Sequence, residues 1–185
     1  MPNWSAKMLF TAEDAIVFNS ARILLLLNVL EKRKDVDLEK LNYYDFFSAN
    51  PFHMISKEEP EYLSLELVGM KSFTINYINS SQRFQTKRAL LKHYLAILVG
   101  KELVDVFNQD GKITFQITDK GGAIAKSIQS MYADAYQTSA KIITKKLNSF
   151  SNTKLSKFAA MKIEGKTFQM DLYDMVDEAH ETNSS

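Results

Sequence analysis

The chain has 185 residues, enough for one good hydrophobic core but not for two large independent domains. It contains no cysteine, which excludes disulfides, thiolate nucleophiles and cysteine-based zinc or iron–sulfur sites and fits a reducing compartment. The net charge of +1 conceals an asymmetry along the chain. Residues 126–162 carry seven basic groups and one acidic group, whereas residues 163–185 carry one basic group and six acidic groups. This pattern indicates a basic surface and an acidic tail that can neutralise it in cis or reach another subunit. A helix with a solvated lysine face explains the basic segment equally well.

The first predicted helix begins near Thr11, where a capping hydroxyl precedes two acidic residues, and runs to about Lys34. Its middle is apolar on more than one face, so we expect it to be central and buried on most sides. Its longest aliphatic run is Ile23 to Leu27, far below the roughly 18 to 20 residues that span a bilayer. The N-terminus also lacks a basic segment followed by an apolar one. We therefore expect a cytoplasmic protein that is neither secreted nor membrane-spanning.

A second helix, capped by Asp35 or Asp37, is predicted to end at Asn50-Pro51. Residues 61–79 are ambiguous between helix and strand, with a preference for helix. The next helix, capped by Ser80 or Ser81, is predicted over about Gln82 to Val99 and is ended by Gly100. Its apolar residues fall on one arc, and they are Leu90, Leu91, Tyr94, Ile97 and Leu98.

A β-hairpin is the most specific local prediction. Two alternating runs, Leu103 to Phe107 and Ile113 to Thr118, are joined through Asp110-Gly111, and both central residues of such a turn need positive φ. A long helix is then predicted over about Ala123 to Asn148 and should pack on the first helix or on a partner. A short helix over Lys154 to Lys162, a last amphipathic helix over 168–180 and disorder over 182–185 complete the chain.

The order of these elements predicts a mainly α protein, a winged helix-turn-helix with a two-stranded β-hairpin wing and additional long helices. We divide the chain into three parts of one compact unit. These are an N-terminal helical part (1–60), a helix plus the winged hairpin (61–122), and a long basic helix with an acidic helical tail (123–185).

Basic side chains mark where such a module can neutralise DNA phosphates. They lie on the helix before the hairpin, at the hairpin tip and on the long helix, and they are Arg83, Lys87, Arg88, Lys92, Lys112, Lys141, Lys145 and Lys146. Contact with a protein, or plain solvation, explains the same residues, and Arg83 and Lys87 can simply edge the core. Double-stranded DNA is therefore an expected partner only as one of several interpretations.

The sequence shows no pattern of a catalytic or metal site. Asp37-Leu38-Glu39-Lys40 matches the end of a nuclease motif, but acids are favoured at a helix N-terminus and we prefer that structural interpretation. His53, His93 and His180 are dispersed, without metal-ligand or triad spacing. We expect a protein that is not an enzyme and that uses no cofactor and no metal.

Two stretches resemble known families. The block from Phe10 to Asp14 and Arg22 to Leu27, continuing through Leu41 to Phe47 and Asn50-Pro51, resembles the small middle component of bacterial ABC-three-component systems. The Lamassu anti-phage and anti-plasmid defence systems belong to that group. The second stretch, Leu103 to Gly121, is similar to the wing of winged-helix proteins, including the kleisin-associated subunits of condensin-like complexes.

The resemblance implies a non-catalytic accessory subunit. It would bind an ATPase resembling the structural-maintenance-of-chromosomes (SMC) proteins and couple it to an effector subunit, often a nuclease, in the same complex. On this interpretation the ATPase senses DNA. The alternative is a homodimeric winged-helix transcription regulator, which would need specific operator binding at about 10⁻⁸ M or tighter.

Overall fold

The computed structural model describes residues 16–31, 33–73, 80–109 and 111–163, with the backbone alone for 80–83 and 85–87. This part of the chain is mostly helical and contains one two-stranded antiparallel sheet. The predicted fold class is thereby confirmed, because the architecture is compatible with a winged helix plus additional helices. No helix in the described ranges is both long and apolar enough to cross a membrane.

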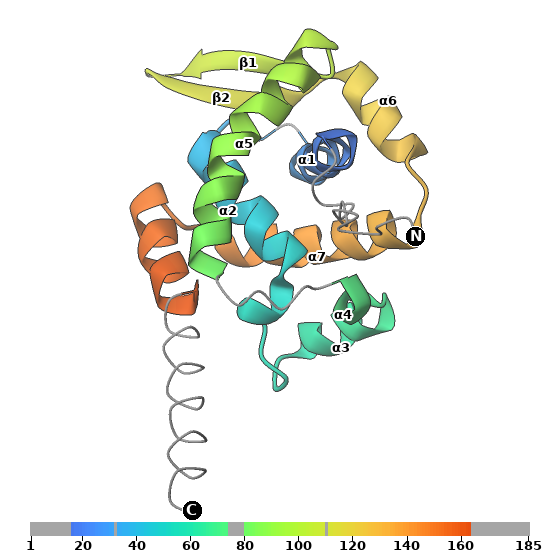
Figure 1. Cartoon of the computed structure of the whole chain (residues 1–185), viewed down its shortest axis with the longest axis vertical. Coiled ribbons are helices and arrows are strands. Elements are labelled where there is room, and N and C mark those ends of the chain that lie inside the picture. Colours follow the sequence, from blue (N-terminus) through green and yellow to red (C-terminus); the bar gives the residue numbers. More distant parts are fainter. Residues whose placement is uncertain (1–15, 32, 74–79, 110, 164–185) are drawn as a thin grey trace, which may run out of the picture.

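Helix α1 (Ile16–Leu30) lies at the centre of the molecule, as predicted. All its residues from Arg22 to Leu27 are buried, because α5, α6, α7 and the hairpin surround it (Figure 1). The helix ends at Leu30, earlier than the predicted Lys34, since Glu31 has a left-handed backbone with φ of 47°. Thr11 and the predicted helix start lie outside the described residues.

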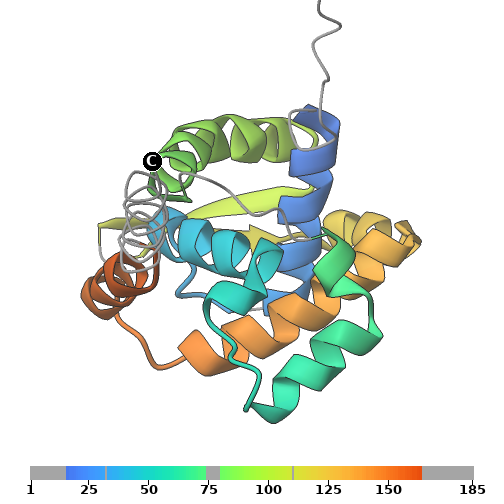
Figure 2. The ribbon, with the colours of Figure 1, turned by 60° about the horizontal axis from the view of Figure 1, so that its bottom comes forward.

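Helix α2 (Leu38–Ala49) begins after Asp37, whose carboxylate accepts a 2.9 Å hydrogen bond from the Lys40 amide. This confirms one of the two predicted caps. Pro51 starts a short 3₁₀ helix, η2 (Pro51–His53), as expected where the α-helix must stop. Helix α2 packs between α5 and α7 (Figure 2).

The ambiguous segment is helical where it is described. Helix α3 (Pro60–Leu67) and the short α4 (Met70–Phe73) are separated by Gly69, whose φ is 73°. Both helices contact α7. Residues 74–79 lie outside the described part.

Helix α5 (Ser80–Gly100) corrects the predicted apolar arc and agrees with the predicted end of the helix. Its buried stripe contains Leu91, Tyr94, Leu95 and Leu98, whereas Leu90 is 44% exposed and does not belong to the buried arc. The helix ends at Gly100, as predicted, but Gly100 is not the residue with the left-handed backbone. The reversal occurs at Glu102, which has a φ of 60°, while the next amide donates to the carbonyl of Leu98 at 2.9 Å.

The predicted hairpin is confirmed. Strand β1 (Val104–Gln109) pairs with β2 (Lys112–Ile117), and the pairing of Gln109 with Lys112 leaves Asp110-Gly111 as a two-residue turn. Gly111 has a φ of 77°. The outer edge of β2 receives a third segment, because the Phe115 amide donates to the Val36 carbonyl at 2.9 Å. The chain between α1 and α2 thus tethers the hairpin to the core.

The predicted single long helix is wrong, because two helices occupy that part of the chain. Helix α6 (Asp119–Ser127) starts at the cap Thr118, and α7 (Met131–Leu147) starts at Ser130, whose hydroxyl accepts from the Ala133 amide at 3.0 Å. Ile128 between them is extended, with ψ of 105°. The bend lets both helices pack against α1, which confirms the predicted packing partner.

A final described helix spans residues 152–163, in agreement with the short helix predicted there. Its buried residues Leu155, Ala159 and Ile163 join the same hydrophobic core as α1 and α2. The helix predicted over 168–180 and the disorder predicted over 182–185 lie outside the described residues. The proposed three-part division of the chain stays a prediction.

Candidate binding groove and basic surface

A buried polar cluster joins α1, α2 and α7. The Arg22 guanidinium donates two hydrogen bonds of 2.8 Å to the two carboxylate oxygens of Asp45, and the Tyr136 hydroxyl donates to the same carboxylate at 2.8 Å. The Arg22 side chain is only 2% exposed. Such a bidentate, sealed pair orients three helices but admits no substrate, so its role is structural.

The electrostatics of this cluster follow from its enclosure. Burial alone would lower the pKa of Arg22, but the adjacent Asp45 carboxylate outweighs it and raises that pKa well above its usual value. Burial, with the charge of Asp45, also raises the pKa of Tyr136. The guanidinium therefore stays charged and the phenol stays neutral at physiological pH.

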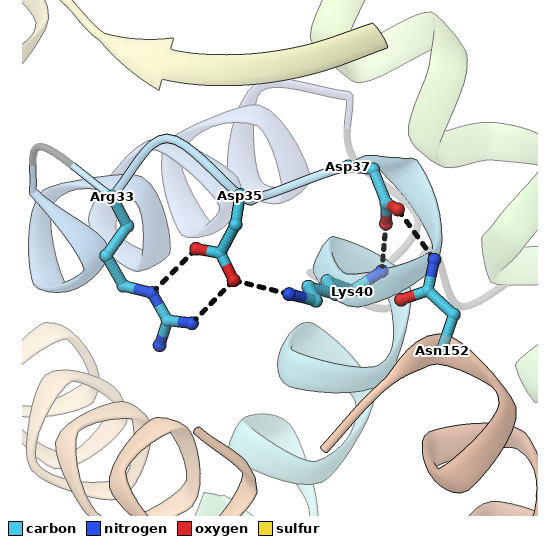
Figure 3. A network of polar contacts seen from close by, with 5 residues as sticks. All are labelled: Arg33, Asp35, Asp37, Lys40 and Asn152. Atoms are coloured by element: carbon cyan, nitrogen blue, oxygen red, sulfur yellow. Dashed lines mark hydrogen bonds and ion pairs between the residues drawn. The ribbon is translucent and has the colours of Figure 1, made fainter. Parts of the chain in front are cut away.

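The nuclease-like segment has a structural role, as preferred above. Figure 3 shows that Asp37 caps α2 and also accepts a 2.6 Å hydrogen bond from the side-chain amide of Asn152, while Asp35 receives Arg33 and Lys40. Burial would raise the pKa of Asp35, but these two cations lower it to about 2. Within the described ranges, no three His, Cys, Asp or Glu side chains are grouped so as to hold a metal.

The Asp37–Asn152 hydrogen bond has a second consequence, because it fixes the start of helix 152–163 against α2. This helix and α5 form two walls of a groove of about 850 Å³, and α2 provides the base. Phe158 packs edge-on against Phe150 and tilted against Phe47, which holds the helix in place.

The base of the groove is aromatic. Tyr43 of α2 and Phe84 of α5 stack with ring centroids 5.2 Å apart. The two walls contribute small side chains, Ala89 on one side and Ala159 with Ala160 on the other. Because these residues have no side chain beyond Cβ, the helices do not fill the space between them and an open channel remains.

Cations line the rim of the groove. Arg88 forms an ion pair with Glu39 of α2, and this contact raises the pKa of Arg88. Lys92, one turn further along α5, is exposed and lines the groove as well. Arg83 and Lys87 belong to the same helix, but their side chains lie outside the described part, so their predicted role is untested.

The other predicted DNA-binding residues lie elsewhere. Lys112 is exposed at the start of β2, and Lys141 and Lys145 are exposed on α7. Lys146 is partly buried, with its ammonium 2.5 Å from a carboxylate oxygen of Glu59 and 3.4 Å from one of Glu61. Among the described side chains, the structure thus brings only Arg88 and Lys92 to the groove.

Sequence reasoning missed the groove itself. Its base and second wall come from segments that are about a hundred residues apart, so local periodicity could not reveal them. One signal was available: residues 80–100 and 152–163 together carry seven basic residues and no acidic one. Two basic helices that both pack against α2 indicate a surface that favours an acidic ligand.

Comparison with known proteins supplies the family. Residues 65–167, more than half of the chain, match the family described as ABC-three component (ABC-3C) system Middle Component 2. The matched range contains the hairpin and both helical walls of the groove. The block from Phe10 to Pro51, which carried the resemblance noted from the sequence, lies outside it. No curated protein and no solved structure matches the chain. The chain belongs to the ABC-three component system Middle Component 2 family.

Proposed function

We propose that this protein is a non-catalytic accessory subunit of a bacterial defence complex against phage or plasmids. In this proposal it bridges an SMC-like ATPase to an effector subunit of the nuclease type, and it works in the cytoplasm. The family description supports membership of a multi-component system. The observation that supports bridging is the presence of two exposed apolar surfaces at opposite ends of the described part (Figure 1).

The first surface is on the hairpin. Val106 and Ile113 lie diagonally on one face of the two strands, Phe107 lies on the other, and all three are exposed, Ile113 by 58%. Within the described residues only β2 pairs with β1, so the outer edge of β1 is also open. An apolar hairpin with a free edge suits a protein partner better than a DNA backbone, because exposed apolar side chains and open edges are features of docking surfaces.

The second surface is on α3. Leu63 and Leu67 are one helical turn apart, and they are 61% and 79% exposed. The opposite side of α3 contacts α4 and α7, with Leu65 fully buried. An amphipathic helix that is anchored on one side and apolar on the other presents a ready surface for a second partner.

Direct DNA contact is a secondary part of the proposal. Lys92, Lys112, Lys141 and Lys145 are exposed and can each neutralise a phosphate. The Arg88 charge is largely satisfied by Glu39. We therefore assign any DNA contact to weak, salt-dependent attraction rather than to base readout by α5.

Co-expression with the products of the neighbouring genes tests the bridge, because the proposal expects an SMC-like ATPase and an effector among them. We expect Val106→Ser/Ile113→Ser to release one partner and Leu63→Ser/Leu67→Ser to release the other, each by about tenfold or more in affinity, because buried apolar anchors dominate interfaces. Met131→Ser, at another exposed apolar position, is the matched control and should release neither. Loss of both partners from either double variant would mean one shared surface, and a chain that stays alone at physiological salt would contradict the proposal.

The hairpin and its tether to Val36 also favour the alternative, a homodimeric winged-helix transcription regulator. The two functions differ in DNA affinity. A regulator should bind one operator at about 10⁻⁸ M or tighter as a dimer, whereas an adaptor should show weak and sequence-independent binding that falls steeply with salt.

A further inference from the structure

The groove between α5 and helix 152–163 lies between two basic helices, and Lys92 at its rim has no ion pair among the described residues. Its two helical walls contain seven basic residues and no acidic one. Glu39, the carboxylate that lines the groove, is already paired with Arg88. Lys92 at the rim is exposed, as are Lys154 and Lys157 on the outer side of helix 152–163. The surroundings therefore favour a negatively charged ligand.

The base of the same groove is apolar. Tyr43 is buried to at least nine tenths and stacks on Phe84, and Ala159 and Ile163 of the adjoining wall are buried to the same degree. Nucleic-acid backbone would leave this base uncovered. An acidic segment with one apolar face would cover the base and pair with the rim at once, as helices do in apolar grooves.

We propose that the acidic C-terminal segment of this chain, residues 164–185, occupies the groove in cis. Ile163, the last described residue of this helix, itself lines the groove, so the segment begins at the site. Residues 164–185 carry six acidic groups and one basic group. This balance complements the seven basic residues of the walls.

The pattern of the segment matches the two chemistries of the groove. At helical spacing, Phe168, Leu172 and Met175 form one stripe, while Asp171, Asp174 and Glu178 form another. The first stripe suits the aromatic base. The second suits Lys92 at the rim.

The length of the segment is sufficient. In this proposal residues 164–167 would serve as a four-residue connection, a length typical of antiparallel neighbouring helices, and Gly165 would tolerate a left-handed backbone there. Residues 168–180 as a helix would be about 20 Å long, against about 30 Å for the 21 residues of α5. Because the segment is tethered, its effective concentration at the groove is on the order of millimolar. Any acidic partner or DNA that uses these cations must first displace it.

The absence of cysteine allows a clean cross-linking test on the full chain. Ala89→Cys places a thiol on the groove wall, and Met175→Cys places one on the apolar stripe. We expect this pair to cross-link with a short bismaleimide about tenfold more efficiently than the control pair Asn108→Cys/Met175→Cys, whose first thiol is exposed on the hairpin. Intact mass and a denaturing gel give the yield and show whether the product is a monomer.

Two charge variants test whether the cross-link depends on electrostatic attraction between the groove and the tail. Lys92→Glu, and separately the neutral tail Asp171→Asn/Asp174→Asn/Glu178→Gln, should each reduce the yield several-fold while circular dichroism stays unchanged. Equal cross-linking yields for the groove pair and the hairpin pair would overturn the proposal. A groove yield that stays the same in both charge variants would overturn it as well. A cross-linked dimer would assign the groove to the tail of a second copy and would overturn docking in cis. The measurement uses the isolated chain, so its outcome is independent of the proposed ATPase and effector.

Discussion

The two faces of helix α2 differ in the environment of their charged side chains: one face buries an ion pair and the other exposes one. Toward α7, Asp45 is sealed with Arg22 and Tyr136 in a cluster that solvent does not reach. Toward α5, Glu39 pairs with Arg88 at the rim of an open groove. The buried pair fixes the positions of three helices, because neither partner can be removed without leaving a charge in the core. The rim pair is solvated and can exchange its partner, so the second face is suited to binding.

The largest expected effect comes from breaking the buried face. Arg22→Met should lower the free energy of unfolding by about 3 to 5 kcal/mol, because it leaves the Asp45 carboxylate buried without its cation. Urea denaturation measures this loss. Arg33→Met is the matched control at the half-exposed pair with Asp35 and should cost less than about 1 kcal/mol. The double variant Arg22→Met/Asp45→Asn should recover part of the loss; no recovery would show that packing, not charge, dominates.

The next effect concerns the junction that sets the hairpin beside α1. A Cβ atom on Gly121 would lie 2.1 Å from the carbonyl oxygen of Leu103, so Gly121→Ala must displace backbone. We expect a loss of about 3 kcal/mol, at the upper end for overpacking. At Gly100 an added Cβ atom would have no neighbour within 4 Å, so Gly100→Ala should instead stabilise the protein by about 0.4 to 1 kcal/mol. Thermal unfolding of both variants measures the two changes. An equal change in stability for the two variants would contradict the close contact between Gly121 and Leu103.

A smaller effect isolates the third member of the buried cluster. Tyr136→Phe keeps the ring but removes the hydroxyl that donates to Asp45. Since hydrogen bonds to charged groups contribute more than neutral ones, we expect a loss of about 2 kcal/mol. A crystal structure of the variant should retain the Arg22–Asp45 contact. An unchanged unfolding midpoint would mean that Arg22 alone satisfies the carboxylate.

The smallest effect is a pH dependence at the surface. The pKa of Asp35 is lowered from 3.8 to about 2 in the folded state, so its ion pairs stabilise the protein above pH 3.8 and this contribution is lost as the pH falls toward 2. Because the side chain is half exposed, the contribution should stay below about 1 kcal/mol. Asp35→Asn should remove it, so the difference in urea midpoint between the two proteins should shrink across that acid range. A constant difference would exclude the ion pairs as its source.

Local chemistry predicted much of this fold. Asp110-Gly111 located the hairpin because few dipeptides adopt a two-residue turn, and Asp37 located the start of α2 because its side chain caps a helix. The break between α6 and α7 was missed. Its signal was Ser130, a capping residue inside an otherwise helical pattern, and only packing against α1 decides whether such a residue bends the chain.

The functional surfaces were less predictable, since they depend on residues distant in the sequence. The segments that contain Arg22 and Asp45 carried the resemblance to the family, but no sequence pattern around either residue indicated that the two side chains form an ion pair. The basic residues of α5 were found by composition, whereas the pairing of Arg88 with Glu39 requires the crossing of α2 and α5. Which charges remain available for a ligand is therefore a property of tertiary structure.

The base of the hairpin is fastened on both strands. The Thr118 amide donates to the Leu103 carbonyl at 3.1 Å, the Thr118 hydroxyl donates to the Glu102 carbonyl at 2.9 Å, and Gly121 closes against the same backbone. The orientation of the hairpin relative to the start of α6 is therefore set by backbone contacts at a tightly packed junction.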